Sequence, residues 1–219
     1  MMRVAPASEP PHFEELVRRP GLSAIGELIG EAPNPPRRGK RRKKVAERRE
    51  DIPGSAYPPL WRQVLPDLLR DYRHICGYMC LYIERVTGAP CVDHQVPKAR
   101  AWDRVYEWGN YRLCCALMNS RKGDAEGVLD PFEVGDDWFV LEAVSCHVLP
   151  GPGAVGKIRS RVEETLRILR LNDEICRKNR QAYVDSYLQG EILLSYLERR
   201  APFIARELRR QGMLLPGDA

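Results

Sequence analysis

The sequence contains no long apolar run. No stretch approaches the roughly 20 apolar residues that a membrane-spanning helix needs, and the first residues show no apolar core of a secretory signal. The seven cysteines are an odd number without regular spacing, which disfavours a disulfide framework. Because 43% of the residues are hydrophobic and 30% are charged, the composition is typical of a globular protein. We therefore expect a cytoplasmic protein with reduced thiols and no membrane contact.

A complete nucleotide-binding loop is also missing. The segment 151–157 fits the pattern G-x-x-x-x-G-K, but Ile158 occupies the position of the hydroxyl that would hold Mg²⁺. Too little chain follows to build a nucleotide-binding sheet, so we interpret this segment as a loop that leads into a helix. Three histidines, His12, His74 and His147, are isolated in the sequence. We interpret them as surface or packed imidazoles rather than metal ligands.

Positive charge is concentrated in one segment. Residues 37–51 contain nine Lys and Arg against three Asp and Glu, a net charge of +6 in a chain whose total is +5. Such a run attracts a phosphate backbone without sequence preference, through counterion release. The alternative is a solvated linker that binds nothing in particular. The residues expected to contact nucleic acid are Arg37, Arg38, Lys40, Arg41, Arg42, Lys43 and Lys44.

Hydrophobic periodicity divides the chain into three parts: 1–59, 60–150 and 151–219. The first should contain two short amphipathic helices, separated near Pro20, and then the basic linker. The second should begin with a helix over 61–74, whose start Pro66 could delay. A strand over 76–83 should then form a hairpin with 91–94, and a second hairpin should cover 138–149. From Ala154 the pattern is helical, with Asn172 or Asp173 as a cap and a break or bend at Pro202.

Chemistry-bearing residues gather between 76 and 124. Asp93-His94 is followed sixteen positions later by Asn110, and nine positions after that by Asn119. Asp93 and Asn119 offer a carboxylate and a carboxamide oxygen, ligands that suit a hard divalent cation. His94 would point to the opposite side of an extended backbone, where a neutral imidazole could act as general base. The alternative is a turn pair followed by two helix-capping asparagines.

Three short patterns within 32 residues, V-D-H-x-x-P-K, W-x-N-Y-R-L and N-x-R-K-G, together resemble the HNH endonuclease signature in its variant with Asn at the third position. The resemblance implies an α+β protein with a ββα-metal (HNH) core, a flanking helix, a second β-hairpin and a C-terminal helical region. It also implies Mg²⁺ or Mn²⁺ on Asp93 and Asn119, and Asn110 as the residue that orients His94. The candidate phosphate contacts are Lys98, Arg121 and Lys122, whose alternative role is a solvated basic rim.

The sequence departs from this family in its cysteines. Many HNH proteins carry two C-x-x-C pairs for a structural zinc, whereas here they read Cys76-Gly-Tyr-Met79 and Cys115-Ala-Leu-Met118. A thioether is a poor zinc ligand, so we expect no zinc, although Cys80 and Cys114 could restore ligands by a shift of register. We prefer buried Cys and Met as hydrophobic residues. Gly123 occupies the position of a third metal ligand in some relatives, so a two-ligand site is expected.

A wider resemblance covers most of residues 9 to 210. E-P-P-x-F-x-x-L-V-R-x-P-G near the start and V-L-D-P-F-E-V-G-D-x-W-F after the motif are similar to a bacterial HNH group that acts with an ATPase partner in anti-phage systems of the Septu or retron type. This resemblance implies a DNA-cleaving defence nuclease. The rival interpretation is a decayed HNH domain kept as a nucleic-acid-binding or scaffold subunit. The sequence leaves the oligomeric state open.

Overall fold

The structure is a computed structural model and describes residues 1–36 and 38–218. Within these residues the chain forms seven α-helices and two antiparallel β-hairpins, so it is an α+β protein. The elements are α1 (Arg19–Leu28), α2 (Leu65–Asp71), β1 (Pro90–His94), β2 (Tyr111–Cys115), α3 (Ala116–Lys122), β3 (Phe139–Glu142), β4 (His147–Pro150), α4 (Gly156–Leu169), α5 (Glu174–Leu188), α6 (Leu194–Arg200) and α7 (Pro202–Arg210).

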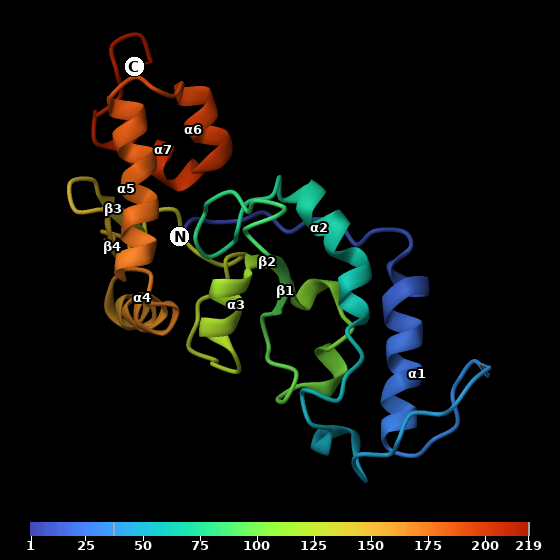
Figure 1. Cartoon of the computed structure of the whole chain (residues 1–219). Helices are drawn as coiled ribbons and strands as arrows, with labels where there is room; N and C mark the ends of the chain where they lie inside the picture. Colours follow the sequence, from blue (N-terminus) through green and yellow to red (C-terminus); the bar gives the residue numbers. More distant parts are fainter. Residues whose placement is uncertain (37, 219) are drawn as a thin grey trace.

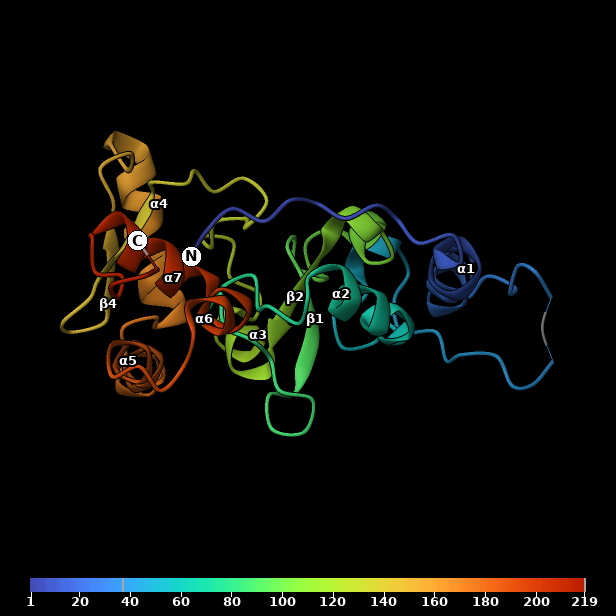
Figure 2. The same cartoon turned by 90° about the horizontal axis from the view of Figure 1, so that it is seen from above.

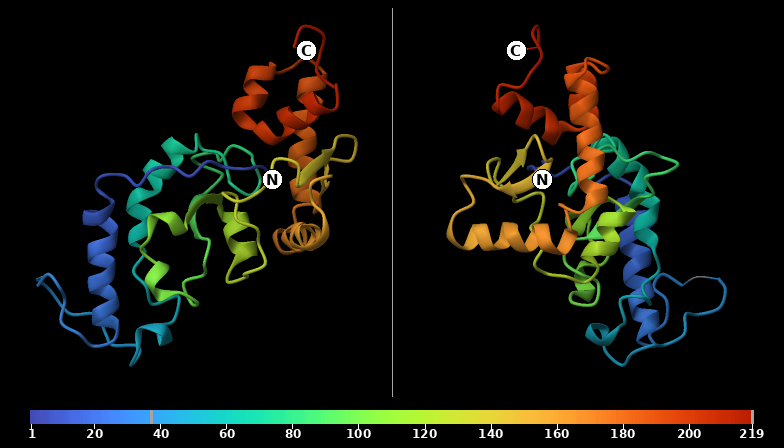
Figure 3. Two further views of the ribbon diagram at one scale, coloured as in Figure 1. Left: turned by 180° about the vertical axis from the view of Figure 1, so that it is seen from behind. Right: turned by 60° about the vertical axis from the view of Figure 1, so that its left-hand side comes forward.

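The elements are arranged along an elongated molecule. Figure 1 shows α1 and α2 at one end, the hairpin β1–β2 with α3 in the middle, and the hairpin β3–β4 with α4 to α7 at the other end. The N-terminal segment crosses from the C-terminal end to α1 (Figure 2), and Val4 N–H donates to the carbonyl of Pro131 on its way. Helices α4 and α5 cross at a steep angle (Figure 3).

A continuous core of buried side chains joins these parts. It contains Phe13 before α1, Leu68 of α2, Met118 of α3, Phe139 of β3 and Phe203 of α7. These residues come from all three parts expected from the sequence, so apolar packing extends across both expected boundaries. Among the described residues, none of the helices combines the length and the apolar character needed to cross a membrane.

The central unit is a hairpin followed at once by a helix. Strands β1 and β2 pair antiparallel, with Asp93 opposite Arg112 and His94 opposite Tyr111. Helix α3 begins at the residue after β2 and packs against both strands. The order strand, loop, strand, helix that the spacing predicts is therefore confirmed. Since successive side chains of a strand point to opposite faces, Asp93 and His94 lie on different sides of β1.

The expected division of the N-terminal helix near Pro20 is wrong. A π-helical turn over Glu14–Arg18 continues directly into α1, and Pro20 occupies the first turn of α1. There its missing N–H does no harm, because the first amides of an α-helix have no partner within the helix. Gly21 lies against the ring of Tyr106, and a Cβ at this position would stand 2.3 Å from ring atoms. The glycine therefore permits close packing rather than ending the helix.

The expected helix over 61–74 is shorter, and the expected strand over 76–83 is wrong. A 3₁₀ turn over Leu60–Val64 precedes α2, so Pro66 does delay the α-helix, as predicted. Residues 76–80 close a turn in which Cys80 N–H donates to the carbonyl of Cys76 at 2.8 Å and Cys80 has a φ of 53°. Only a single bridge, between Ile75 and Tyr82, remains of strand pairing in this segment. The partner of β1 is therefore β2.

The C-terminal predictions are confirmed. Strands β3 and β4 form the second hairpin, and the segment 151–155 is a loop that leads into α4. Asp173 caps α5 by accepting a hydrogen bond from Cys176 N–H. The last helical stretch breaks before Pro202 into α6 and α7. Turn residues, helix caps and prolines act on the backbone next to them, so these features can be predicted from local sequence.

Candidate functional site

Asp93 is a buried carboxylate with a hydrogen-bond donor on each oxygen. Its residue is 3% exposed. Tyr78 Oη donates to Oδ2 at 2.6 Å, and the ammonium of Lys122 donates to Oδ1 at 3.1 Å. Burial raises the pKa of Asp93, while Lys122 and Tyr78 act in the opposite direction. Burial also raises the pKa of Tyr78, so its hydroxyl stays protonated and donates.

His94 lies on the other face of β1, between aromatic rings. Its ring meets Trp61 edge to face, with 4.7 Å between centroids, and Tyr111 at 5.1 Å. The Nε2 atom lies 3.0 Å from the carbonyl oxygen of Val105. Because a carbonyl can only accept, Nε2 carries the proton, and Nδ1 keeps the lone pair of the neutral ring. Nδ1 is therefore the atom of His94 that can take up a proton.

The pKa of His94 is lowered to about 3, mainly by burial and further by the charge of Lys98. We expect the His94 ring to show no titration between pH 8 and 5 by NMR, with the signal assigned from its loss in His94→Gln. Since the unfolded chain binds a proton below about pH 6.5, the stability contributed by neutral His94 is present above that pH and falls as the pH drops toward 3. A titration midpoint near 6.5 would contradict this environment.

Asn110 organises the loop between β1 and β2 rather than the imidazole itself. Its Oδ1 accepts from Val96 N–H at 2.7 Å, and its Nδ2 donates to the carbonyls of Val96 and Arg104 at 3.1 and 3.0 Å. Its backbone carbonyl accepts from Gln95 N–H. Arg104 directly precedes Val105, whose carbonyl holds His94. Asn110 therefore acts on His94 through the loop, with no hydrogen bond to the ring among the described residues.

Helix α3 brings Asn119 and Lys122 to the same side, because residues three apart are neighbours on a helix surface. Lys122 has no exposed side-chain area and also donates to the backbone carbonyl of His94 at 2.7 Å. Asn119 is half-buried, and its side chain has no hydrogen-bond partner in the described part of the chain. In residues 1–36 and 38–218 there is no group of three or more His, Cys, Asp and Glu suited to a metal ion.

Lys98 stands at the rim of this site. Its ammonium lies 4.5 Å from the centre of the Trp61 ring, a cation–π contact, and burial lowers its pKa. Trp61 therefore contacts both Lys98 and the ring of His94. The charge of the exposed Arg62 also acts on Lys98. Two cationic side chains at this rim could meet a phosphate that approaches His94.

The site therefore contains a neutral imidazole with an unprotonated Nδ1, a buried carboxylate paired with the ammonium of Lys122, and basic side chains at the rim. Such a set suits proton transfer next to an anionic substrate. No protein-family model matches the chain, and no curated protein does.

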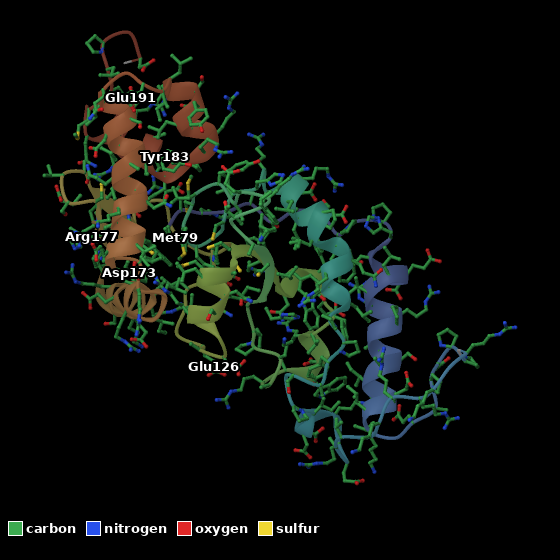
Figure 4. The ribbon with its side chains drawn as sticks, viewed as in Figure 1. Met79, Glu126, Asp173, Arg177, Tyr183 and Glu191 are labelled. Atoms are coloured by element: carbon green, nitrogen blue, oxygen red, sulfur yellow. The ribbon has the colours of Figure 1, made fainter. Side chains whose placement is uncertain are left out.

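Arg121 points away from the site and joins α3 to the C-terminal helices. It pairs with the carboxylate of Asp173, the residue labelled at the start of α5 in Figure 4. It also donates to the carbonyls of Leu169 and Arg170 at 3.0 and 3.1 Å. Of the three candidate phosphate contacts, Lys98 is at the rim, Lys122 is turned inward to Asp93, and Arg121 holds two parts of the fold together.

The basic residues after α1 form an exposed loop, the basic arm, defined by residues 38–44. Figure 1 shows this loop extending from the end of the molecule that carries α1. The chain beyond it is anchored by Val45 N–H, which donates to the carbonyl of Leu28, and Lys44 pairs with Glu47. Arg37 lies outside the described residues. The exposed members are Arg38, Lys40, Arg41, Arg42, Lys43 and Lys44.

Sequence reasoning missed several residues that shape the site. Trp61 and Tyr78 contact His94 and Asp93 from segments before the three patterns, and the Val105 carbonyl contacts His94 from the loop between the first two patterns. No local sequence pattern predicts these three contacts. The sequence did contain a signal for the inward position of Lys122, because N-x-x-K places the lysine one turn after Asn119 on the same helix face.

Proposed function

We propose that this chain is a metal-dependent endonuclease of the ββα-metal (HNH) type that hydrolyses phosphodiester bonds in DNA. The observation that carries the proposal is the arrangement of Asp93 and His94 at the end of β1, beside α3. Asp93 faces the helix that carries Asn119 and Lys122, and His94 offers a neutral imidazole on the opposite face of the strand.

The donor set fits Mg²⁺ or Mn²⁺ on one condition. A carboxylate from Asp93 and a carboxamide from Asn119 are hard oxygen ligands, and such ions keep several waters beside few protein ligands. The ammonium of Lys122 is the cation now held by Asp93, so it must leave Oδ1 before a divalent ion can bind there. A bound ion would offset the charge that develops on the phosphate and the leaving oxygen.

The chain's own residues supply the proton transfer. His94 would take a proton on Nδ1 from the water whose oxygen attacks phosphorus, and the 3′ or 5′ oxygen of the cleaved strand would leave. The Val105 carbonyl fixes the ring by its bond to Nε2, and Asn110 fixes the loop that carries Val105. An anionic phosphate beside the ring favours the protonated form, which raises the pKa of His94 toward the range that general bases need. Lys98 and Arg62 would hold the phosphate.

The assay for this function is the conversion of supercoiled plasmid to nicked and linear forms by the purified chain, with Mg²⁺ or Mn²⁺ and with EDTA. Cation-dependent conversion that disappears in His94→Ala supports the proposal. Cleavage by His94→Ala at the wild-type rate would discard this mechanism.

Neutralising the basic arm should weaken DNA binding and flatten its salt dependence. In the triple variant Arg38→Gln, Arg41→Gln and Lys43→Gln, the slope of log K against log salt should fall by up to about 3, since each phosphate contact contributes about 0.9. Binding is measured by fluorescence anisotropy of a labelled duplex at several salt concentrations.

The matched control removes the same number of positive charges from exposed positions on α4 and α5, by changing Arg159, Arg167 and Lys178 to Gln. This control should change the slope much less. If the slope of log K against log salt is the same in the arm variant and the wild type, the basic arm is a spacer that does not contact DNA.

We also propose that the nuclease works with an ATPase partner in bacterial anti-phage defence, which rests on the sequence resemblance. The competing candidate is a non-catalytic nucleic-acid-binding or scaffold subunit. It is favoured by one observation, that both oxygens of Asp93 are already taken by Tyr78 and Lys122. The plasmid assay with and without a co-encoded ATPase separates the two, since DNA binding without cleavage under both conditions supports the scaffold.

A further inference from the structure

A cavity of about 1010 Å³ lies where three distant segments meet: the start of the chain, the segment after α2 and helix α6. Figure 2 shows α6 beside the N-terminal segment and the loop that follows α2. Pockets for small ligands run from about 300 to 1,000 Å³, so this cavity has room for a ligand with several chemical groups. It shares no residue with the site around Asp93 and His94.

Positive charge dominates the lining of this cavity. Four arginines line it, against two acidic residues. Both carboxylates are paired with arginines outside the lining, Asp71 with Arg70 at 2.8 Å and Glu198 with Arg209 at 2.7 Å. Three of the four lining arginines have no ion-pair partner in the described part of the chain, and these are Arg3, Arg73 and Arg199. The cavity therefore offers an excess of guanidinium groups to an anion.

Arg200, the fourth arginine, is held by aromatic and ionic contacts. Its guanidinium lies 3.6 Å from the centre of the Tyr82 ring and 5.7 Å from that of Tyr196, and it pairs with Glu84. The pair with Glu84 uses Nη2, and Nη1 has no partner among residues 1–36 and 38–218. Residues four apart lie on the same side of a helix, so Tyr196 and Arg200 face the cavity together. A guanidinium held in this way is pre-organised to bind a phosphate.

The backbone that carries Arg73 is strained. Arg73 and His74 lie just after α2 with φ values of 50° and 62°, a region that residues with a Cβ rarely adopt. Backbone strain of this kind gathers at ligand sites. The ring of His74 stacks on Tyr82 at 5.1 Å, and its Nδ1 and the Nε of Arg200 are buried without a hydrogen-bond partner in the described residues. The protein's own groups therefore do not complete this wall of the cavity.

The lining suits a ligand that carries several negative charges and an aromatic ring. One phosphate carries about two negative charges near pH 7, fewer than these guanidinium groups can offset, so a chain of phosphates fits better. Tyr196 is 37% exposed, and a base can stack on its ring. We propose that this cavity binds a nucleoside polyphosphate, with its phosphates on Arg73, Arg199 and Arg200 and its base on Tyr196.

The shape of the site favours a small ligand over a nucleic-acid strand. A strand needs a groove that follows its backbone, whereas this cavity is walled by three segments. The N–H of Tyr82 donates to the carbonyl of Arg200 at 2.8 Å, so the walls from α6 and from the segment after α2 are already joined. This proposal does not rest on the nuclease, because a chain that binds a nucleotide and leaves DNA intact would still satisfy it.

The test is isothermal titration calorimetry of the full chain with ATP and with GTP, in EDTA so that no metal ion contributes. Each nucleotide should bind at one site per chain, and AMP should bind at least about tenfold more weakly, because it has fewer phosphate oxygens to accept charged hydrogen bonds. Arg73→Gln and Arg199→Gln should each weaken ATP binding at least about tenfold for the same reason. Both side chains are exposed, so the variants should fold.

Tyr196→Leu separates the contribution of the base from that of the phosphates. This variant should weaken ATP binding about tenfold, the usual loss when a base loses its stacking partner. Inorganic tripolyphosphate has no base, so its affinity should be the same in Tyr196→Leu and in the wild type. If tripolyphosphate binds as tightly as ATP and Tyr196→Leu changes neither, the assignment to a nucleotide is wrong.

The matched control is Arg161→Gln. Arg161 is an exposed arginine of α4 that does not line the cavity and has no ion-pair partner in the described residues. This variant should bind ATP as the wild type does. The proposal is overturned if neither ATP nor GTP binds at millimolar concentration, or if ATP affinity is unchanged in either Arg73→Gln or Arg199→Gln. A single-stranded oligonucleotide that displaces ATP and binds more tightly would assign the cavity to nucleic acid instead.

Discussion

Replacing His94 with alanine is expected to lower the rate of cation-dependent plasmid nicking by about 10²- to 10⁴-fold, the usual contribution of a positioned general base. The expectation rests on the tautomer of the ring. Because the Val105 carbonyl occupies Nε2, Nδ1 is the only ring atom that can accept a proton, and alanine removes it. DNA affinity should stay within a few-fold of the wild type, since the cationic groups that would hold the backbone, at the rim and on the arm, are unchanged.

The control for this variant is His147→Ala. His147 is a half-buried histidine of β4 whose Nδ1 bonds Ser145 in the second hairpin, so its loss should leave nicking unchanged. Circular dichroism must show that His94→Ala is folded, because the ring packs against Trp61 and Tyr111. A folded His94→Ala protein that nicks at the wild-type rate would remove His94 from the mechanism.

The backbone of the site could be predicted from the sequence more fully than its side-chain contacts. The spacing of Asp93, Asn110 and Asn119 predicts strand, loop, strand and helix, and the structure has this order. The second hairpin and the break at Pro202 are also local signals and are confirmed. The pairing of the strands could not be predicted from local sequence. Apolar and polar residues alternate only loosely over 76–83, and a turn at Cys80 interrupts this segment, so β1 pairs with β2 instead.

Side-chain partners depend on which segments meet in space, and a single sequence does not display this. Arg121 and Lys122 are adjacent in the sequence and both looked like phosphate contacts. On a helix adjacent residues point about 100° apart, so one reaches Asp173 beside α5 and the other reaches Asp93. Asn110 was expected to orient the imidazole. Instead, its Nδ2 donates to the carbonyl of Arg104, and the carbonyl of the next residue, Val105, contacts the ring of His94.

Replacing Lys122 with methionine is expected to destabilise the metal-free protein by about 3–5 kcal/mol, the cost of removing one partner from a buried ion pair. The Lys122 side chain has no exposed area, and that of Asp93 is 4% exposed, so water cannot take the place of the ammonium. The measurement is urea unfolding in the presence of EDTA. Lys178→Met, which removes an exposed lysine paired with Glu174, is the matched control and should change stability by less than about 1 kcal/mol.

Adding Mn²⁺ then tests whether Asp93 can hold a divalent ion. In Lys122→Met the Oδ1 atom has lost its ammonium, so Mn²⁺ at 100 times its dissociation constant should restore about 2.7 kcal/mol of stability. The wild type should respond less, because its own lysine competes for the same oxygen. The double variant Asp93→Asn with Lys122→Met has no buried charge left to satisfy, and it should be more stable than Lys122→Met and insensitive to Mn²⁺. If Mn²⁺ stabilises neither Lys122→Met nor the wild type, Asp93 is a structural ion-pair partner, and the scaffold interpretation takes the place of the nuclease.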